Sequence, residues 1–328
     1  MTTTYSHPQK YIRPFDVRCD LLPVADLIET CFADRLSREG EALVRKMRSS
    51  AGNKRFKRWA VRAAGRVSMP LSGFIWEDGR NVLGNLSFIP FRSFRRNYYL
   101  IANVAVHPDY QRQGIGRALV QRALQDLDTR QLDGIWLQVE DINQAAVDLY
   151  LQTDFQEIAR RTTWILEPQK SQNAPPPLCQ QEAMIQNRPP RHWEFQKRWL
   201  EKTYPKTLRW YFPFEFWSIR GNILGALAQF LLESPPTKQW TAIQATGEIA
   251  GILTWQASSG YADRLWLAAP PERAGLAIRT FFPALPKHER YRRPLRLNYP
   301  AGWAVTHLKQ AGFTPVRTLI WMKWGKGN

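Results

Sequence analysis

The stretch Asn103-Val-Ala-Val-His-Pro-Asp-Tyr-Gln-Arg-Gln-Gly-Ile-Gly-Arg-Ala-Leu-Val-Gln-Arg122 decides the fold of this chain. Its apolar run from Val104 to Val106 predicts a strand that ends at His107-Pro108. From Ile115 onward, apolar residues recur every four positions, which predicts an amphipathic helix. The segment is therefore expected to form a strand, a polar loop and a helix, with glycine at 114 and 116 where the helix begins.

The start of this helix has the features of an anion site. The first four N–H groups of a helix lack internal partners and carry the positive end of its dipole. Glycine at 114 and 116 removes the side chains that would keep a phosphate away from them. The spacing excludes the nucleoside-triphosphate loop, because no Lys-Ser or Lys-Thr follows, and the dinucleotide fingerprint, because a third glycine is absent.

A second block lies about thirty residues downstream. An apolar strand, Ile135 to Val139, precedes a stretch with helical spacing, and Asp154-Phe155 leads to the strand-like run Thr162 to Leu166. The Gln-x-x-Gly-x-Gly loop after Val-x-Val-x-Pro is similar to the acetyl-coenzyme A signature of the GCN5-related N-acetyltransferase (GNAT) family. The second block resembles that family's motif Asn-x-x-Ala-x-x-Leu-Tyr-x-x-x-Gly-Phe, which is matched at Asn143, Ala146, Leu149, Tyr150 and Phe155. Only Asp154 departs, and aspartate tolerates the left-handed backbone that glycine favours.

The resemblance covers residues 11 to about 167. Tyr11 to Pro14 resembles the family's first strand and Asp20 to Phe32 its first helix, while 71–76 and 82–88 predict a hairpin around residues 77–80. The implied fold is of the α+β class, with a mixed, mostly antiparallel sheet flanked by helices.

The resemblance also implies roles for residues, with acetyl-CoA as co-substrate and no metal. The backbone of the strand before the loop would bind the acetyl carbonyl, and the loop would hold the pyrophosphate. Asn143 would position the pantetheine arm or a water. The implied cofactor-binding residues are Val104, Ala105, Val106, Gln111, Arg112, Gln113, Gly114, Ile115, Gly116, Arg117 and Asn143.

Amine acetylation also needs an acid and a base. Tyr150 matches the family's usual general acid, which protonates the leaving thiolate, although a tyrosine in this place is also a common core residue. Glu140, after the strand ending at Val139, is the candidate base, with Asp141 as the alternative. His107 is expected to be structural, and none of the three cysteines falls on a motif that would make it a nucleophile.

The second half echoes the first. Residues 295–324 repeat the order strand, Asn, helix, Gly-Phe, Arg-Thr strand, and residues 243–256 would form the preceding hairpin. We expect a catalytic domain at 1–168, a Pro/Gln-rich linker at 169–190 and a second, degenerate copy at 191–328. Glu272 is aligned with Gln111, Ala277 with Gly116 and Leu308 with the tyrosine, so the second copy is expected to have lost catalysis.

The chain is strongly basic, with 46 Lys and Arg against 28 Asp and Glu. Nine basic residues and no acid lie between Arg45 and Arg66. This segment indicates an acidic, protein or nucleic-acid-bearing acceptor, or simply a solvated helical face. Aromatic residues between Trp193 and Trp217 favour a core over base stacking. No apolar run is long enough to span a membrane, and the scattered cysteines fit a reducing cytoplasm.

The sequence thus predicts an N-acetyltransferase that transfers the acetyl group of acetyl-CoA directly to a primary amine of an unidentified acceptor. The alternative is a non-catalytic adaptor on the same scaffold, which binds nucleic acid or a ribosomal particle through its basic surface.

Overall fold

The computed structural model describes residues 11–33, 36, 38–79, 81–93, 96–168, 183–212, 237–288 and 293–325. The chain divides into a first unit, Met1–Ala159 with Leu319–Asn328, and a second unit, Arg160–Thr318. Several residues used in the sequence predictions lie outside the described residues, namely Arg80 in the predicted turn, 169–182 of the predicted linker with Cys179, and Phe214, Phe216 and Trp217.

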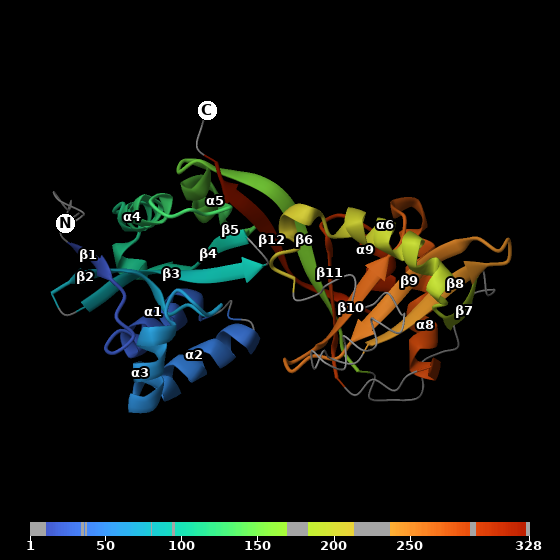
Figure 1. Ribbon diagram of the computed structural model, residues 1–328, viewed down its shortest axis with the longest axis horizontal. Coiled ribbons are helices and arrows are strands. Elements are labelled where there is room, and N and C mark those ends of the chain that lie inside the picture. Colours follow the sequence, from blue (N-terminus) through green and yellow to red (C-terminus); the bar gives the residue numbers. More distant parts are fainter. Residues whose placement is uncertain are drawn as a thin grey trace. The chain divides into compact units, whose positions relative to one another are not determined.

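The first unit is a mixed sheet in the order β1-β2-β3-β4-β5-β12 (Figure 1). Its strands are β1 (Ile12–Pro14), β2 (Ser72–Asp78), β3 (Asn81–Ser93), β4 (Arg96–Val106), β5 (Gly134–Glu140) and the end of β12 (Thr314–Trp324). Its helices are α1 (Leu21–Phe32), α2 (Arg38–Ala51), α3 (Lys54–Ala63), the short 3-10 turn η2 (Pro108–Tyr110), α4 (Ile115–Asp128) and α5 (Gln144–Leu151). The predicted strands, helices and hairpin of residues 11–151 are all present.

Each face of this sheet is covered by helices. Residues of α4 and α5, among them Leu119 and Val147, form one core with the strands. Residues of α1, α2 and α3, among them Val24, Val44 and Ala60, form a second core on the opposite face (Figure 1). No helix in the described residues is long and apolar enough to cross a lipid bilayer.

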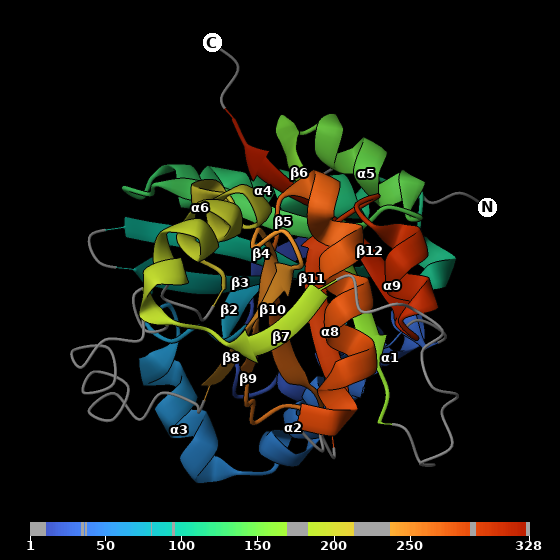
Figure 2. The same cartoon turned by 90° about the vertical axis from the view of Figure 1, so that its right-hand side faces the viewer.

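The second unit repeats this plan. Its sheet order is β6-β11-β10-β9-β8-β7, and α6 covers one face while α8 and α9 cover the other (Figure 2). Its strands are β6 (Phe155–Leu166), which starts in the first unit, β7 (Ala183–Asn187), β8 (Thr237–Gln244), β9 (Ile249–Gln256), β10 (Asp263–Ala268) and β11 (Leu295–Pro300). Its helical segments are η3 (Pro190–His192), α6 (Trp193–Thr203), η4 (Lys206–Leu208), η6 (Pro271–Arg273), α8 (Ala274–His288) and α9 (Val305–Gln310).

A matching pair of glycines supports the internal repeat. A Cβ built on Gly84 of β3 would lie 3.0 Å from Ile115 and from Leu119 of α4. A Cβ on Gly251 of β9 would lie 2.7 Å from Ala277 of α8. Each unit therefore uses a glycine on the second strand of its central hairpin to let the helix after the next strand approach the sheet closely.

The last strands of the two halves are exchanged. Strand β12 pairs with β5 of the first unit, with Ile320 opposite Val139, whereas β6 pairs with β11 of the second unit, with Thr163 opposite Asn298. The unit boundary therefore falls at Ala159/Arg160 rather than at the predicted 168/169, and 319–325 belong to the first unit. Within the predicted linker, Ala183–Asn187 forms β7, an edge strand of the second unit.

The exchange makes a testable prediction about Met322, which is 1% exposed in the core of the first unit. Met322→Ala should lower the free energy of unfolding by about 2–5 kcal/mol, because it leaves a cavity. Met184→Ala, at a residue that is 74% exposed on β7, is the matched control and should change stability by less than about 0.5 kcal/mol. Hydrogen exchange in Met322→Ala should accelerate in β5; acceleration in β11 instead would contradict the exchanged pairing.

Candidate active site

The loop after β4 has a backbone that few sequences can adopt. Gln111 donates from Nε2 to the Val106 carbonyl at 3.2 Å, which folds the loop back on the strand end. Arg112 then has φ +60° and Gly114 has φ +83°. The left-handed conformation costs an L-residue such as arginine about 1–2 kcal/mol. When left-handed residues alternate with residues of negative φ, neighbouring N–H groups point toward one place, and this arrangement binds anions.

The N–H groups of residues 112–117 are available to such an anion. Gln111 N donates to Pro108 O at 3.3 Å and Ala118 N donates to Gly114 O at 2.9 Å. Between them, in the described part of the chain, no backbone N–H from Arg112 to Arg117 has a protein acceptor. The N-cap position of α4 is Gly114, so no side chain occupies the end of the helix. The chemistry of this cradle fits a pyrophosphate.

The neighbouring strands separate beside this loop. Strands β4 and β5 pair in parallel only from Tyr98–Gly134 to Ile101–Leu137. Past this point β4 is bulged against β3, and Asn103 has φ +52°. The fully buried Asn85 donates from Nδ2 to the Asn103 carbonyl at 2.8 Å and so holds the bulge. Beside residues 103–106, β4 and β5 are therefore no longer paired, and we call this separation of the two strands the opening.

Helix α5 brings the second motif to the loop. A Cβ built on Gly116 would lie 3.4 Å from Leu149 and 3.7 Å from Val106, so the first turn of α4 lies against α5 and the end of β4. Arg117 also hydrogen-bonds Gln152 just after α5. The loop, Val106 and the helix that contains Tyr150 thus lie close together in the first unit.

Tyr150 faces the core of the first unit. Its side chain is 5% exposed and its ring lies 5.9 Å from that of Phe155. Burial raises the pKa of its phenol well above its ordinary value of 10, so the side chain stays neutral and can donate a proton. Among the described residues the Tyr150 hydroxyl has no hydrogen-bond partner. Its oxygen is also not completely buried.

The other polar candidates have different surroundings. Asn143 caps α5, with its Oδ1 accepting from Ala146 N at 3.3 Å, so part of its amide is already used. Glu140 is the last residue of β5. It lies past the point where β5 pairs with β4, and it is opposite Leu319 of β12. Both Glu140 and Asp141 are half-buried. His107 accepts from Asp109 N at 3.4 Å and caps η2, which agrees with a structural role.

Cys31 was missed by the sequence analysis. It lies on α1 and its thiol donates to the Val106 carbonyl at 3.2 Å, next to the loop. Burial raises the pKa of this thiol to about 11, so it is protonated and poorly nucleophilic at neutral pH. The spacing of apolar residues along α1 could not have indicated this contact, because the contact joins residues 75 positions apart in the sequence.

The second unit has a different loop. In the first unit, η2 is followed by Gln111–Gly114 before α4 begins. In the second unit, η6 is followed directly by α8 at Ala274, so the cradle segment has no counterpart. The alignment of Glu272 with Gln111 is therefore wrong, because Glu272 lies within η6 and corresponds to Asp109. Gly275 is a packing residue, since a Cβ there would meet the His307 ring at 2.6 Å.

Side chains also fill the place where β10 and β11 separate. Their parallel pairing ends at Leu265–Leu297, and the next carbonyl, of Asn298, accepts from Arg161 Nη2 and from the Tyr204 hydroxyl, each at 2.8 Å. Arg161 is 2% exposed and lies 4.6 Å from the centre of the Tyr204 ring. In the first unit, no side chain among the described residues donates to the corresponding Gln138 carbonyl.

Comparison with known proteins agrees with this geometry. Residues 35–155 match the model of the Acetyltransferase (GNAT) family. The chain therefore contains a domain of the GNAT family, and it has the GNAT fold.

Individual relatives are similar over shorter stretches. The [ribosomal protein bS18]-alanine N-acetyltransferase of Escherichia coli (strain K12) is 44% identical over 62 residues, which are 19% of this chain and 42% of that protein. Streptothricin acetyltransferase A of Bacillus subtilis is 31% identical over 84 residues, 26% of this chain and 47% of that protein. The chain thus spans less than half the length of these relatives.

A solved structure is similar over almost the whole chain. It is a GCN5-related N-acetyltransferase from Sphaerobacter thermophilus, with a TM-score of 0.55, 14% identity and 95% coverage of both chains. At this identity the similarity concerns the fold, and it includes both halves of the chain.

The backbone of the cradle can be tested at Gly114, whose surroundings leave open space for a Cβ but whose φ is +83°. Gly114→Ala should destabilise the protein by about 1–2 kcal/mol, because the cost is backbone strain alone. Gly52→Ala also has open space and no positive φ, and it should not be destabilising. Denaturant midpoints measure both; equal midpoints for the two variants would mean that residue 114 is not left-handed.

Proposed function

We propose that this protein is an N-acetyltransferase that transfers the acetyl group of acetyl-CoA directly to a primary amine. The observation that carries the proposal is the run of unpartnered N–H groups at residues 112–117 beside the opening between β4 and β5. A pyrophosphate would be bound by these groups and by the positive end of α4. The acetyl thioester would lie along residues 103–106, where the strand no longer pairs with β5.

The chain's own residues would supply the remaining chemistry. The amine nitrogen attacks the carbonyl carbon, the carbon–sulfur bond breaks, and the departing sulfur takes a proton from the Tyr150 hydroxyl. The proton lost by the amine passes to Glu140, directly or through a water, with Asp141 as the alternative base. Of the predicted residues Val104, Ala105 and Val106, the N–H groups of Val104 and Val106 point away from β3 and would stabilise the negative charge on the carbonyl oxygen. Because Cys31 is a neutral thiol, direct transfer is favoured over an acetyl-cysteine intermediate.

We infer an amine as acceptor without choosing its carrier. The two relatives act, by their names, on the alanine of a ribosomal protein and on streptothricin. The amine must be neutral to attack, so activity should rise with pH while the acceptor and the base lose protons.

We further propose that the second unit does not bind acetyl-CoA. It has no segment corresponding to Gln111–Gly114, and the Asn298 carbonyl at the strand separation is already bonded to Arg161 and Tyr204. Its role is then structural: it includes the segment that leads to β12, which completes the first unit's sheet.

Acetyl-CoA binding gives a direct test of the cradle. Acetyl-CoA at about one hundred times its dissociation constant should stabilise the protein by about 2.7 kcal/mol, and the shift should vanish in Gly116→Glu. The Glu side chain fits locally, since its Cβ would lie 3.4 Å from Leu149, but its charge opposes a pyrophosphate. Gln121→Glu adds the same charge on the exposed face of α4 and should keep the shift. A shift that persists in Gly116→Glu would place the ligand elsewhere, the second unit included.

The role of Tyr150 predicts a kinetic signature. Tyr150→Phe should reduce kcat by about 10²–10⁴-fold and leave acetyl-CoA binding unchanged, because only the proton donor is lost. The raised pKa keeps the phenol protonated, so its titration should depress kcat only well above pH 10. Tyr98→Phe, a buried tyrosine where β4 still pairs with β5, should retain activity. Unchanged turnover in Tyr150→Phe would exclude the phenol as the acid.

A further inference from the structure

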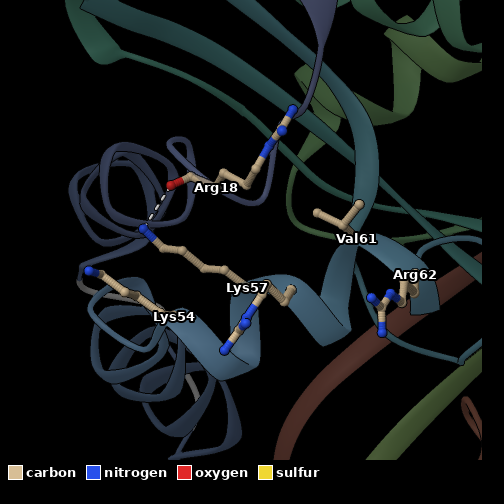
Figure 3. Close-up of a pocket in the computed structure, with 6 residues that line it drawn as sticks. Arg18, Lys54, Lys57, Val61 and Arg62 are labelled. Atoms are coloured by element: carbon tan, nitrogen blue, oxygen red, sulfur yellow. Dashed lines mark hydrogen bonds between the residues drawn. The ribbon is translucent and has the colours of Figure 1, made fainter.

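Helix α3 carries a positively charged surface that the proposed acetyl transfer does not use. Together with Arg18, which comes just before α1, it forms a hollow of about 590 Å³ (Figure 3). The hollow is lined by Arg18, Lys54, Lys57, Arg58, Val61 and Arg62. We call these residues, with Arg55 and Trp59, the α3 surface. None of them belongs to the loop 107–116, to β4 or to α5.

The α3 sequence explains why the charges gather on one side. Ala60 and Ala63 are buried against α1 and α2, and Asn53 caps the helix by accepting from Arg55 N and Phe56 N. Lys54, Arg58 and Arg62 are spaced by four residues, which places them on one face about 6 Å apart along the helix axis. The helix contains no acidic residue.

Three cations of the α3 surface are not neutralised by any of the described residues. Arg48 of α2 is paired with Asp26 at 2.6 Å and Glu29 at 2.7 Å, and Arg18 is paired with Asp16. In contrast, Lys54, Arg58 and Arg62 have no acidic partner among the described residues. The Lys57 ammonium donates to the Arg18 carbonyl at 2.7 Å, which connects α3 to the segment before α1 at the hollow (Figure 3). Because a carbonyl carries no net charge, the positive charge of Lys57 is not neutralised by this contact. A row of unpaired cations is complementary to a polyanion.

An aromatic side chain distinguishes among polyanions. Trp59 is 45% exposed, and it lies four residues after Arg55 and three before Arg62 on the same helix. Its ring is supported by Phe56, with centroids 5.5 Å apart. An exposed tryptophan beside arginines offers a base a stacking platform, which an acidic peptide would not use and a base-paired strand would not reach.

We propose that the α3 surface binds single-stranded nucleic acid. Its backbone phosphates would contact Lys54, Arg58 and Arg62 along the hollow, and an unstacked base would lie on Trp59. Arginine suits phosphate because its guanidinium can donate two parallel hydrogen bonds. This binding is independent of acetyl transfer, and it would hold the enzyme near a nucleic-acid-bearing partner.

Binding of a labelled single-stranded oligouridine to the full chain, measured over a salt series, tests the proposal. Lys54→Ala/Arg58→Ala/Arg62→Ala should reduce the slope of log K against log salt by about 2, since three phosphate contacts are lost. Trp59→Ala should weaken binding about tenfold, whereas Trp59→Phe should keep most of the affinity. Lys197→Ala/Arg198→Ala/Lys202→Ala removes the same charge from the exposed side of α6 and should bind like the wild type.

Competition experiments separate the alternatives. Oligouridine should outcompete polyglutamate and anionic lipid vesicles. The α3 variants should keep the wild-type thermal unfolding midpoint, which shows that they are folded, and their stabilisation by acetyl-CoA is measured separately. Absence of oligouridine binding, equal binding by the α6 control and α3 variants, or displacement by polyglutamate with no effect of Trp59→Ala would each overturn the proposal. Because acetyl-CoA binding is read separately, failure here leaves the proposed acetyl transfer unaffected, and the reverse also holds.

Discussion

Strand β5 must stay extended past the point where its parallel partner leaves it. Over Gly134–Leu137 it pairs with β4, and over Trp136–Glu140 it pairs with β12. The hydrogen bonds to β12 satisfy one edge of β5, so β4 can bulge at Asn103 without unravelling the sheet. The opening, the position of Glu140 and the placement of α5 all depend on this antiparallel pairing. Residues 319–324 therefore support the site although none of them is a candidate for chemistry.

Strain and burial at the site are offset by the surrounding core. Arg112 and Asn103 both have positive φ, which a flexible loop would not maintain. Asn85, buried in β3, fixes Asn103, and the contact of α4 with Gly84 fixes the start of the helix that follows Arg112. The backbone of the proposed cradle is thus fixed by the surrounding core, so the proposed anion binding would need little reorganisation.

The local elements of the first unit were predictable because each has a clear period and end signal, as in the strand and helix around His107-Pro108. Gly114, Gly116 and Tyr150 remain predicted site residues, and they were identified from the resemblance of two stretches to the motifs of one family. The exchange of β6 and β12 was not predictable, because the two strands contain the same pattern, at Arg161-Thr162 and at Arg317-Thr318, and either strand could complete either sheet. The bulge at Asn103 and the thiol contact of Cys31 depend on residues distant in sequence. For Asn85, the one available signal of a special role was that a polar residue stands inside the apolar stretch 82–88.

The exchanged strand also determines when the first unit can be completed during synthesis. Strand β5 is made well before residues 160–318, yet its partner β12 follows them. Until then β5 exposes an unpaired edge next to apolar residues such as Val139, which favours pairing with other chains. The high sequence separation of this contact also predicts slow completion of the sheet. We expect the first unit to reach its final fold only after the second half of the chain has been synthesised, so that the two halves fold as one unit.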